Sequence, residues 1–157
     1  MNYSISNYFQ KHGFRQKDIE KAIIYETIVS RGQTTRKRLN LQLKMRPNNI
    51  TTFTKELIDD GLIIEDSTIK NTQRGRPEVL LKANPDKLVA ISIWVESTNL
   101  MGAIMNLEGK QSFVTFHTIK ENADNTEFLN TLYNLINSLL IKVKAKQTLI
   151  SIGFALP

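Results

Sequence analysis

Three successive helix patterns, separated by turn residues, constrain the fold of this chain more than any other feature of its sequence. The first pattern, Asp18–Ser30, places apolar residues at spacings of three and four, which is typical of an amphipathic helix, and Gly32 ends it. A second, short helix is expected over about residues 36–43, with Thr34 and Thr35 as candidate N-caps. The chain therefore begins with a helical unit.

The third helix pattern runs from about Asn48 to Asp60, after a turn at Lys44–Pro47 and before Gly61. On a helical wheel, four apolar residues share one face: Ile50, Phe53, Leu57 and Ile58. This face is expected to pack on the first two helices, which leaves polar residues on the opposite face.

A strand, a turn and a returning strand are expected next, over Leu62–Glu65, Gln73–Arg76 and Val79–Lys82. Three helices followed by a two-stranded wing is the order of elements in a winged helix-turn-helix. We therefore predict an α+β chain in which residues 1–82 form a winged helix-turn-helix DNA-binding domain.

The net charge of +6 lies entirely in this first half of the chain. All seven arginines lie at or before Arg76, and residues 83–157 hold as many acidic as basic side chains. No acidic residue interrupts the basic ones between Arg31 and Lys55. Such a local excess of positive charge favours a polyanionic partner, here double-stranded DNA, although an ordinary solvated basic face is the alternative.

The third helix is the expected recognition helix, because the second helix of a helix-turn-helix pair enters the major groove. Asparagine pairs with adenine through two hydrogen bonds, and threonine offers a hydroxyl and a methyl group that contacts thymine. The expected base-reading residues are Asn48, Asn49, Thr51, Thr52 and Lys55. A plain solvated helix surface is the alternative for these side chains.

Residues around the turn are expected to contact phosphates, which supplies affinity without reading sequence. These residues are Thr35, Arg36, Lys37, Arg38, Lys44 and Arg46. In the wing, Arg74 and Arg76 flank Gly75 before Pro77, a pattern that suits insertion into a narrow A·T-rich minor groove. A β-turn with solvated charges is the alternative for the wing.

The second half of the chain is expected to contain strands and one helix. Strands are expected over Leu88–Val95, Leu100–Leu107 and Gln111–Ile119, a helix over Thr126–Lys144, and a last strand over Thr148–Ala155. Because a helix precedes the last strand, that strand is expected to run parallel to an earlier one.

The chain resembles the ROK family (repressors, open reading frames and sugar kinases) in two stretches, TTRKRLNLQLKMRPNNITTFTKELIDDGLIIE and RGRPEVLLKANP. The family pattern is a recognition helix ending in LxxxGL, then GRP, then LxxNP. Leu57–Leu62, Gly75–Pro77 and Leu81–Pro85 match it in order and spacing. The resemblance is to the repressors of sugar-utilisation genes, and it implies that residues 83–157 form a partial actin-like, ribonuclease-H-like α/β lobe of the ROK type.

Two departures from the family pattern bear on activity. Family kinases carry a phosphate-binding D-x-G-x-x-T turn, in which Trp94 here replaces the aspartate and Glu96 the first glycine. The resemblance therefore implies that the chain is not an enzyme. The later family segments, with the sugar-contacting carboxylates, are absent, so the chain is expected to be a fragment or a natural truncation. A sugar effector is expected only if the remainder of that domain is present.

Several kinds of chemistry are not expected. The chain has no cysteine, His12 and His117 lack metal-ligand spacing, and no glycine pattern typical of phosphate or dinucleotide binding occurs. We predict no metal, no cofactor and no catalytic residue. No apolar run has the length of a signal peptide core or a membrane span, so a cytoplasmic location without a membrane partner is expected.

The sequence predicts a repressor of carbohydrate-utilisation genes that acts as a homodimer on a pseudo-palindromic, A·T-rich operator. Two alternatives come from other classes. The chain could be a protein-interaction module that binds full-length family members or a transport protein, which a mixed complex unable to bind DNA would favour. It could also be a sugar kinase or sugar-binding protein, which phosphorylation of a hexose would favour.

Overall fold

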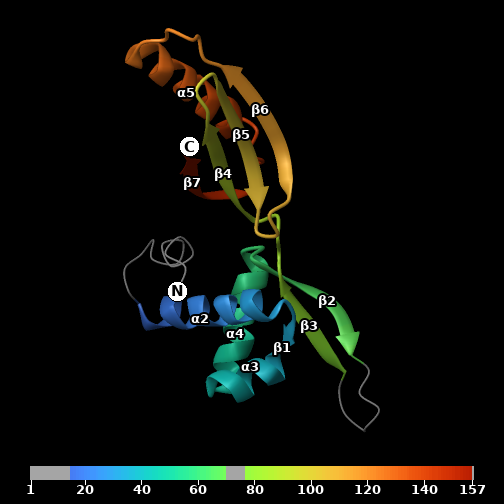
Figure 1. The fold of residues 1–157 in the computed structure, drawn as a ribbon. Coiled ribbons are helices and arrows are strands. Elements are labelled where there is room, and N and C mark those ends of the chain that lie inside the picture. Colours follow the sequence, from blue (N-terminus) through green and yellow to red (C-terminus); the bar gives the residue numbers. More distant parts are fainter. Residues whose placement is uncertain (1–14, 70–76, 157) are drawn as a thin grey trace. The chain divides into compact units, whose positions relative to one another are not determined.

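A computed structural model describes residues 15–69 and 77–156 of the chain (Figure 1). The chain divides into two compact units, one up to Asn84 and one from Pro85. The first unit combines three described helices with a sheet and the second combines one described helix with a sheet, which agrees with the predicted mixture of helices and strands. The predicted turn at Gln73–Arg76, with Arg74, Gly75 and Arg76, lies outside the described residues.

The first unit places helices ahead of an antiparallel hairpin. Its elements are α2 (Gln16–Arg31), β1 (Thr34–Thr35), α3 (Arg36–Leu43), α4 (Pro47–Asp59), β2 (Ile63–Ile69) and β3 (Glu78–Ala83). The strand order is β1-β3-β2, and both pairings are antiparallel. The predicted helices agree with α2, α3 and α4 to within two residues at each end, whereas β2 continues to Ile69, beyond the predicted end at Glu65.

The strand β1 is a correction to the sequence prediction. Neither Thr34 nor Thr35 was expected in a strand, but they pair with Leu81 and Leu80 of β3. The pairing buries both threonines, which are 1% exposed. A strand of two residues leaves no periodic signal in the sequence, and only its partner strand reveals it.

The core of the first unit forms where α4 packs on α2 and α3, above the hairpin. Its buried apolar residues come from the helices and from around the hairpin strands: Ala22, Ile24, Tyr25, Ile28, Leu39, Ile50, Phe53, Leu57, Leu62, Ile63 and Leu81. Each of the buried Leu, Ile and Phe side chains among them contributes about 1.5–3 kcal/mol by leaving water. This packing fixes which side of α4 faces outward.

The C-terminus of α4 explains two of the patterns that carry the family resemblance. Gly61 has a φ of +73°, which a residue with a side chain adopts at a cost. The N–H groups of Gly61 and Leu62 donate to the carbonyls of Ile58 and Leu57, each at 2.9 Å, and so close the helix in a Schellman motif. Asn84 then donates its side-chain amide to the Gly61 carbonyl at 2.9 Å. Gly61 of the LxxxGL pattern and Asn84 of the LxxNP pattern are therefore in contact at the C-terminus of α4.

The second unit is a four-stranded sheet with one helix. Its elements are β4 (Leu88–Val95), β5 (Asn99–Asn106), β6 (Gln111–Thr118), α5 (Asn125–Leu140) and β7 (Thr148–Ala155), with strand order β6-β5-β4-β7. The predicted parallel pairing of the last strand is confirmed, because β7 runs parallel to β4.

The helix α5 is shorter than predicted. It ends at Leu140 rather than Lys144, and two turn hydrogen bonds follow, from Lys142 to Leu139 and from Val143 to Leu140. Val143 still packs on the core of this unit from that turn. The apolar spacing therefore continued past the last helical residue, and for this reason the sequence overestimated the length of the helix.

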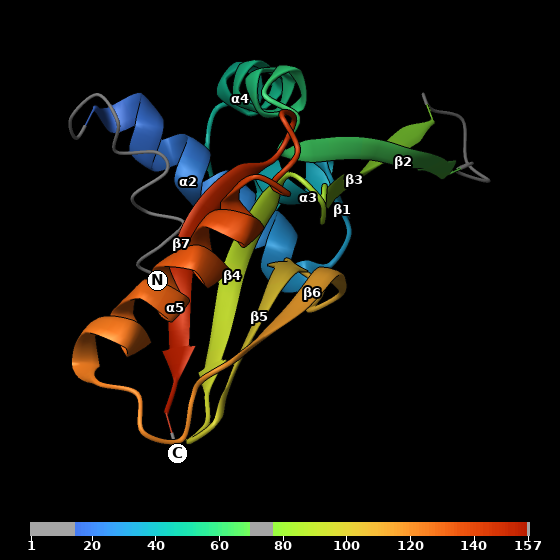
Figure 2. The same cartoon turned by 90° about the horizontal axis from the view of Figure 1, so that it is seen from above.

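One face of the sheet packs against α5 (Figure 2), where Leu135 and Leu139 are fully buried. On the opposite face, Trp94, Met101 and Phe116 stand side by side across β4, β5 and β6. Trp94 is 50% exposed and Phe116 is 67% exposed. We call these three side chains, Trp94, Met101 and Phe116, the aromatic row of the second unit.

Gly102 on β5 provides a test of the packing under α5. A Cβ atom at this position would lie 2.6 Å from Cδ1 of Leu139 and 3.2 Å from Cδ1 of Leu135. We expect Gly102→Val to lower the free energy of unfolding by about 1–3 kcal/mol, measured by urea denaturation, because the helix must move away. Gly153→Val on β7 is the matched control, since nothing lies within 4 Å of its Cβ position. Equal stability of the two variants would contradict this packing.

Candidate nucleic-acid interface

The helix α4 separates its side chains into a buried face and an exposed face. Proline occupies its first turn, where the missing N–H costs no hydrogen bond. The buried face consists of Ile50, Phe53, Thr54 and Leu57, while Ile58, predicted for this face, is half-buried. The outer face consists of Asn48, Thr51, Thr52 and Lys55, all exposed. Four of the five predicted base-reading residues therefore share one solvent-facing surface, which we call the outer face of α4.

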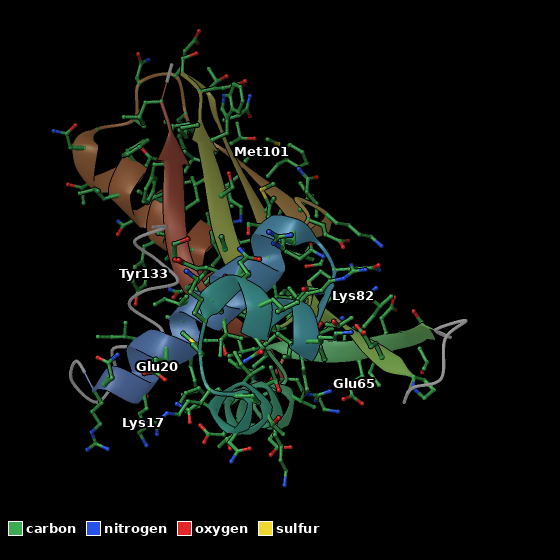
Figure 3. The ribbon with its side chains drawn as sticks, turned by 90° about the horizontal axis from the view of Figure 1, so that it is seen from below. Lys17, Glu20, Glu65, Lys82, Met101 and Tyr133 are labelled. Atoms are coloured by element: carbon green, nitrogen blue, oxygen red, sulfur yellow. The ribbon has the colours of Figure 1, made fainter. Side chains whose placement is uncertain are left out.

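Asn49 is the predicted base-reading residue that does not belong to the outer face. It is half-buried, and its side-chain amide donates to Oε2 of Glu20 on α2 at 3.4 Å. Glu20 is labelled on that helix in Figure 3. On the helical wheel Asn49 lies at the border between the two faces. Its hydrogen bond to Glu20 holds the side chain against α2.

Thr35 has one of the two roles that the sequence predicted, that of the N-cap of α3. Its hydroxyl accepts a hydrogen bond from the backbone N–H of Arg38 at 3.3 Å, which makes Thr35 the N-cap of α3. The same hydroxyl donates to Oε2 of Glu78 on β3 at 2.8 Å. Because the residue is 1% exposed and its hydroxyl is bonded on both sides, the expected phosphate contact by this side chain is wrong.

Arg36 is also engaged within the protein. Its Nε donates to Oγ1 of Thr54 on α4 at 3.0 Å, and its Nη2 lies 2.9 Å from Oε1 of Glu65 on β2. Glu65 is labelled in Figure 3. The guanidinium therefore joins α3, α4 and β2, while the phosphate contact expected of Arg36 stays a prediction.

The remaining basic residues predicted to contact phosphate are solvent-facing. Arg38, Lys44 and Arg46 are exposed on α3 and in the turn that follows it. Lys37 is 70% exposed, although its Nζ lies 3.4 Å from Oε1 of Glu78. Lys44 has a φ of +53°, which ends α3 and turns the chain towards Pro47. These four cations surround the turn that leads into the outer face of α4.

A hollow of about 470 Å³ opens where the first turn of α3, the helix α4 and the start of β3 meet. It is lined by Thr35, Arg36, Lys37, Thr51, Pro77, Glu78 and Val79. Thr51 belongs both to the hollow and to the outer face of α4, so the two surfaces are continuous. The hydroxyl of Thr35 and the ammonium of Lys37 approach the carboxylate of Glu78, which limits the repulsion this carboxylate exerts on a polyanion.

The acidic residues of the hairpin were missed by sequence reasoning. Besides Glu65 and Glu78, Asp66 on β2 accepts a hydrogen bond from Gln33 at 3.1 Å and lies 3.4 Å from Nζ of Lys82. The sequence did contain a signal for these ion pairs, because acidic residues lie in the strands next to the basic helices. Such a pattern predicts ion pairs within the unit. Counting positive charge alone overestimates the number of cations available to a partner.

Neither a metal site nor a membrane segment is found in the part of the chain that the structure describes. Over residues 15–69 and 77–156, no three His, Cys, Asp or Glu side chains gather closely enough to hold a metal ion. None of the helices in these ranges has the length and apolar character that crossing a membrane requires.

The chain is similar to transcriptional regulators of the ROK family. A solved member of that family, described as a homologue of the E. coli MLC protein, matches 90% of this chain with 29% sequence identity and a TM-score of 0.64. Among individual proteins, a xylose repressor from Caldicellulosiruptor bescii is 26% identical over 146 residues, again 90% of this chain. No family model matches the chain. The resemblance predicted from the sequence is thus confirmed.

The matched region is only part of each relative. The chain spans 35% of the length of the xylose repressor and 36% of the length of the solved regulator. About a third of such a regulator is therefore represented in these two units.

An ion pair joins α4 to α2, and its contribution to the stability of the first unit should depend on pH. Nζ of Lys21 lies 2.9 Å from Oε2 of Glu56, and the lysine side chain is 14% exposed. Burial lowers the pKa of Lys21, but the hydrogen bond and charge of Glu56, with the charges of Asp18 and Asp60, outweigh it and raise the pKa above its ordinary value.

We expect Glu56→Gln to destabilise the chain by about 1 kcal/mol at neutral pH, a value between exposed and buried ion pairs. Because the pKa of Lys21 is raised on folding, its contribution is fully present below the unfolded pKa of about 10.4 and is lost as pH rises through the folded value. Urea denaturation of both proteins between neutral pH and about pH 11 measures the difference. A difference that stays constant across this range would contradict the ion pair.

Proposed function

We propose that the first unit is a winged helix-turn-helix that binds double-stranded DNA, and that the chain regulates transcription. The observation that carries this proposal is the division of α4 into a buried apolar face and an outer face of polar residues beside exposed cations. The helices α3 and α4 form the helix-turn-helix pair, and the hairpin β2–β3 is the wing.

In this proposal, the residues of the outer face of α4 contact the bases. The first turns of a recognition helix approach base edges in the major groove, and Asn48 is exposed in the first turn of α4. Its amide offers a donor and an acceptor that match adenine, while Thr51 and Thr52 offer hydroxyl and methyl groups. Lys55 adds a cation one turn further along the helix.

Affinity comes from the cations around the turn. Lys37 and Arg38 in the first turn of α3, and Lys44 and Arg46 between α3 and α4, are exposed. Phosphate contacts by such residues release counterions and make binding steeply dependent on salt. Arg74 and Arg76, on either side of Gly75, complete the proposal as minor-groove contacts of the wing, supported by their sequence pattern.

The similarity to known regulators supports the biological class. Both relatives are transcriptional regulators by description, and one of them is a xylose repressor. We extend the proposal to repression of carbohydrate-utilisation genes on this basis. A sugar effector belongs to the proposal only for a longer polypeptide that contains the rest of the ROK domain.

The second unit is the candidate for interaction rather than catalysis. We assign it as the partial ROK lobe expected from the sequence, which the order of its strands and helix supports, with Glu96–Thr98 forming the turn between β4 and β5. In place of a phosphate-binding turn, this segment carries the exposed carboxylate of Glu96 beside the exposed Trp94. We propose that the unit transfers no phosphate and that its aromatic row pairs two copies of the chain.

DNA binding is tested with the full chain in two steps. Selection from a random duplex pool yields an enriched duplex, and fluorescence anisotropy then compares it with a scrambled duplex of equal composition at two salt concentrations. Preferential binding of the enriched duplex is expected. Equal binding of both duplexes at each salt concentration would reduce the first unit to a non-specific basic domain.

Asn48 and Asn49 form a matched pair for the readout assignment. Asn48→Ala is expected to cost about 1–3 kcal/mol on the enriched duplex and to relax preference at one base pair. Asn49→Ala is expected to leave binding unchanged, because this amide faces Glu20. Similar losses from both changes in the anisotropy assay would show that the assignment of the outer face is wrong.

Arg38→Ala should act on all sequences alike. We expect weaker binding to the enriched and the scrambled duplex and a salt slope that is flatter by about one unit, because one phosphate contact is lost. The measurement is a salt series of anisotropy titrations. A loss confined to the enriched duplex would instead assign Arg38 to base reading.

Pairing of two copies is tested on the aromatic row. A single helix-turn-helix reads one half-site, so a pseudo-palindromic operator requires two chains. We expect Phe116→Ser to convert a dimer to a monomer in light scattering and to weaken operator binding. Tyr133→Ser is the control, since Tyr133 is 65% exposed on α5, which packs on the other face of the sheet (Figure 3). A monomeric unaltered chain at micromolar concentration would contradict the proposal.

A further inference from the structure

Arg36 makes contacts that a residue serving only as a phosphate ligand would not need. Its side chain is 31% exposed, and the two nitrogens with assigned partners point to different elements. Nε donates to Thr54 of α4 at 3.0 Å and Nη2 to Glu65 of β2 at 2.9 Å. The planar guanidinium has a fixed fork of donors, so it holds both partners at a defined separation.

The partner on α4 is itself held in place. Thr54 is fully buried, and its hydroxyl donates to the Ile50 carbonyl at 2.7 Å while it accepts from Arg36. The Thr51 carbonyl lies 3.1 Å from the same hydroxyl, so its hydrogen is directed at the preceding turn of α4 and a lone pair is left for Arg36. A shift of α4 along or around its axis would break the hydrogen bond to Arg36.

A second contact joins the same turn of α3 to the other hairpin strand. Thr35 and Lys37 flank Arg36 in sequence, and both approach the carboxylate of Glu78 on β3, at 2.8 Å and 3.4 Å. Three consecutive residues at the start of α3 thus contact both strands of the hairpin. Only Arg36 among them also bonds to α4.

We propose that Arg36 is a positioning residue that fixes the recognition helix relative to the wing, through Thr54 and Glu65. This inference rests on the proposed DNA-binding function. A helix in the major groove and a wing in the neighbouring groove must fit one duplex together, and loss of the fixed angle weakens base readout more than phosphate contact. Arg36 therefore determines specificity without touching a base.

Glu65→Gln separates this role from simple electrostatics. Glu65 is 49% exposed and carries negative charge near a DNA-binding surface. If only charge mattered, its neutralisation would strengthen binding to every duplex. If Glu65 holds Arg36 in position, its neutralisation lowers the preference for the enriched duplex.

Arg36→Lys separates the positioning role from a phosphate contact. Lysine keeps the charge, so a phosphate ligand would be largely rescued, but it lacks the fork that reaches Thr54 and Glu65 together. The test measures affinity for the enriched and the scrambled duplex, and the salt slope, for the unaltered full chain, Arg36→Lys and Glu65→Gln. Asp59→Asn, which removes an exposed carboxylate at the last residue of α4, controls for loss of charge.

We expect Arg36→Lys and Glu65→Gln each to lower the ratio of the two affinities about fivefold, the size typical of residues coupled in one network. The salt slope should not change with Arg36→Lys, and Asp59→Asn should leave the ratio unaltered. A ratio that is unchanged in both Arg36→Lys and Glu65→Gln would overturn the proposal.

A measurement without DNA keeps this inference separate from the proposed function. Amide hydrogen exchange of the same proteins reports how firmly α4 and β2 are held. We expect faster exchange around Thr54 in α4 and in β2 for Arg36→Lys and Glu65→Gln, but not for Asp59→Asn. If the unaltered chain prefers no duplex, the proposed function fails, and this exchange alone decides whether Arg36 fixes α4. Exchange identical to that of the unaltered chain would contradict the positioning role.

Discussion

The burial of one side of α4 is the interaction on which the rest of the first unit depends. Ile50 and Leu57 are 1% and 0% exposed against α2 and α3, so rotation of the helix would bring apolar surface into water. With that side fixed, Asn48 and Lys55 have to face outward. The surface offered to a partner is therefore a consequence of core packing, and the ion pair from Lys21 to Glu56 reinforces it at the rim.

The basic residues of the first unit fall into two groups, which its net charge alone does not distinguish. Glu65 and Glu78 on the hairpin strands engage Arg36 and Lys37, so part of the positive charge stabilises the fold. The cations left facing solvent gather around the turn before α4. The basic residues thus serve two purposes, and the ones that order the scaffold lie next to the ones available to a polyanion.

The spacing of apolar residues along the sequence predicted the features that depend only on neighbouring residues. It gave the two faces of α4 and the position of the last strand, which runs parallel to β4. It could not give the partners of Arg36, which lie 18 and 29 residues away on α4 and β2, nor the partner of Thr35, which lies 43 residues away. Such contacts arise from tertiary packing, and a charged or capping residue carries no sign in its own segment of which partner it will meet.

Contact between DNA and the outer face of α4 can be observed residue by residue, by backbone and side-chain amide shifts of the full chain in NMR spectra recorded with and without an enriched duplex. We expect large shifts for the side-chain amide of Asn48 and for the amides of Thr51, Thr52 and Lys55, and small ones for the side-chain amide of Asn49 and the interior of the second unit. Shifts concentrated on the aromatic row, with the outer face of α4 unperturbed, would contradict it.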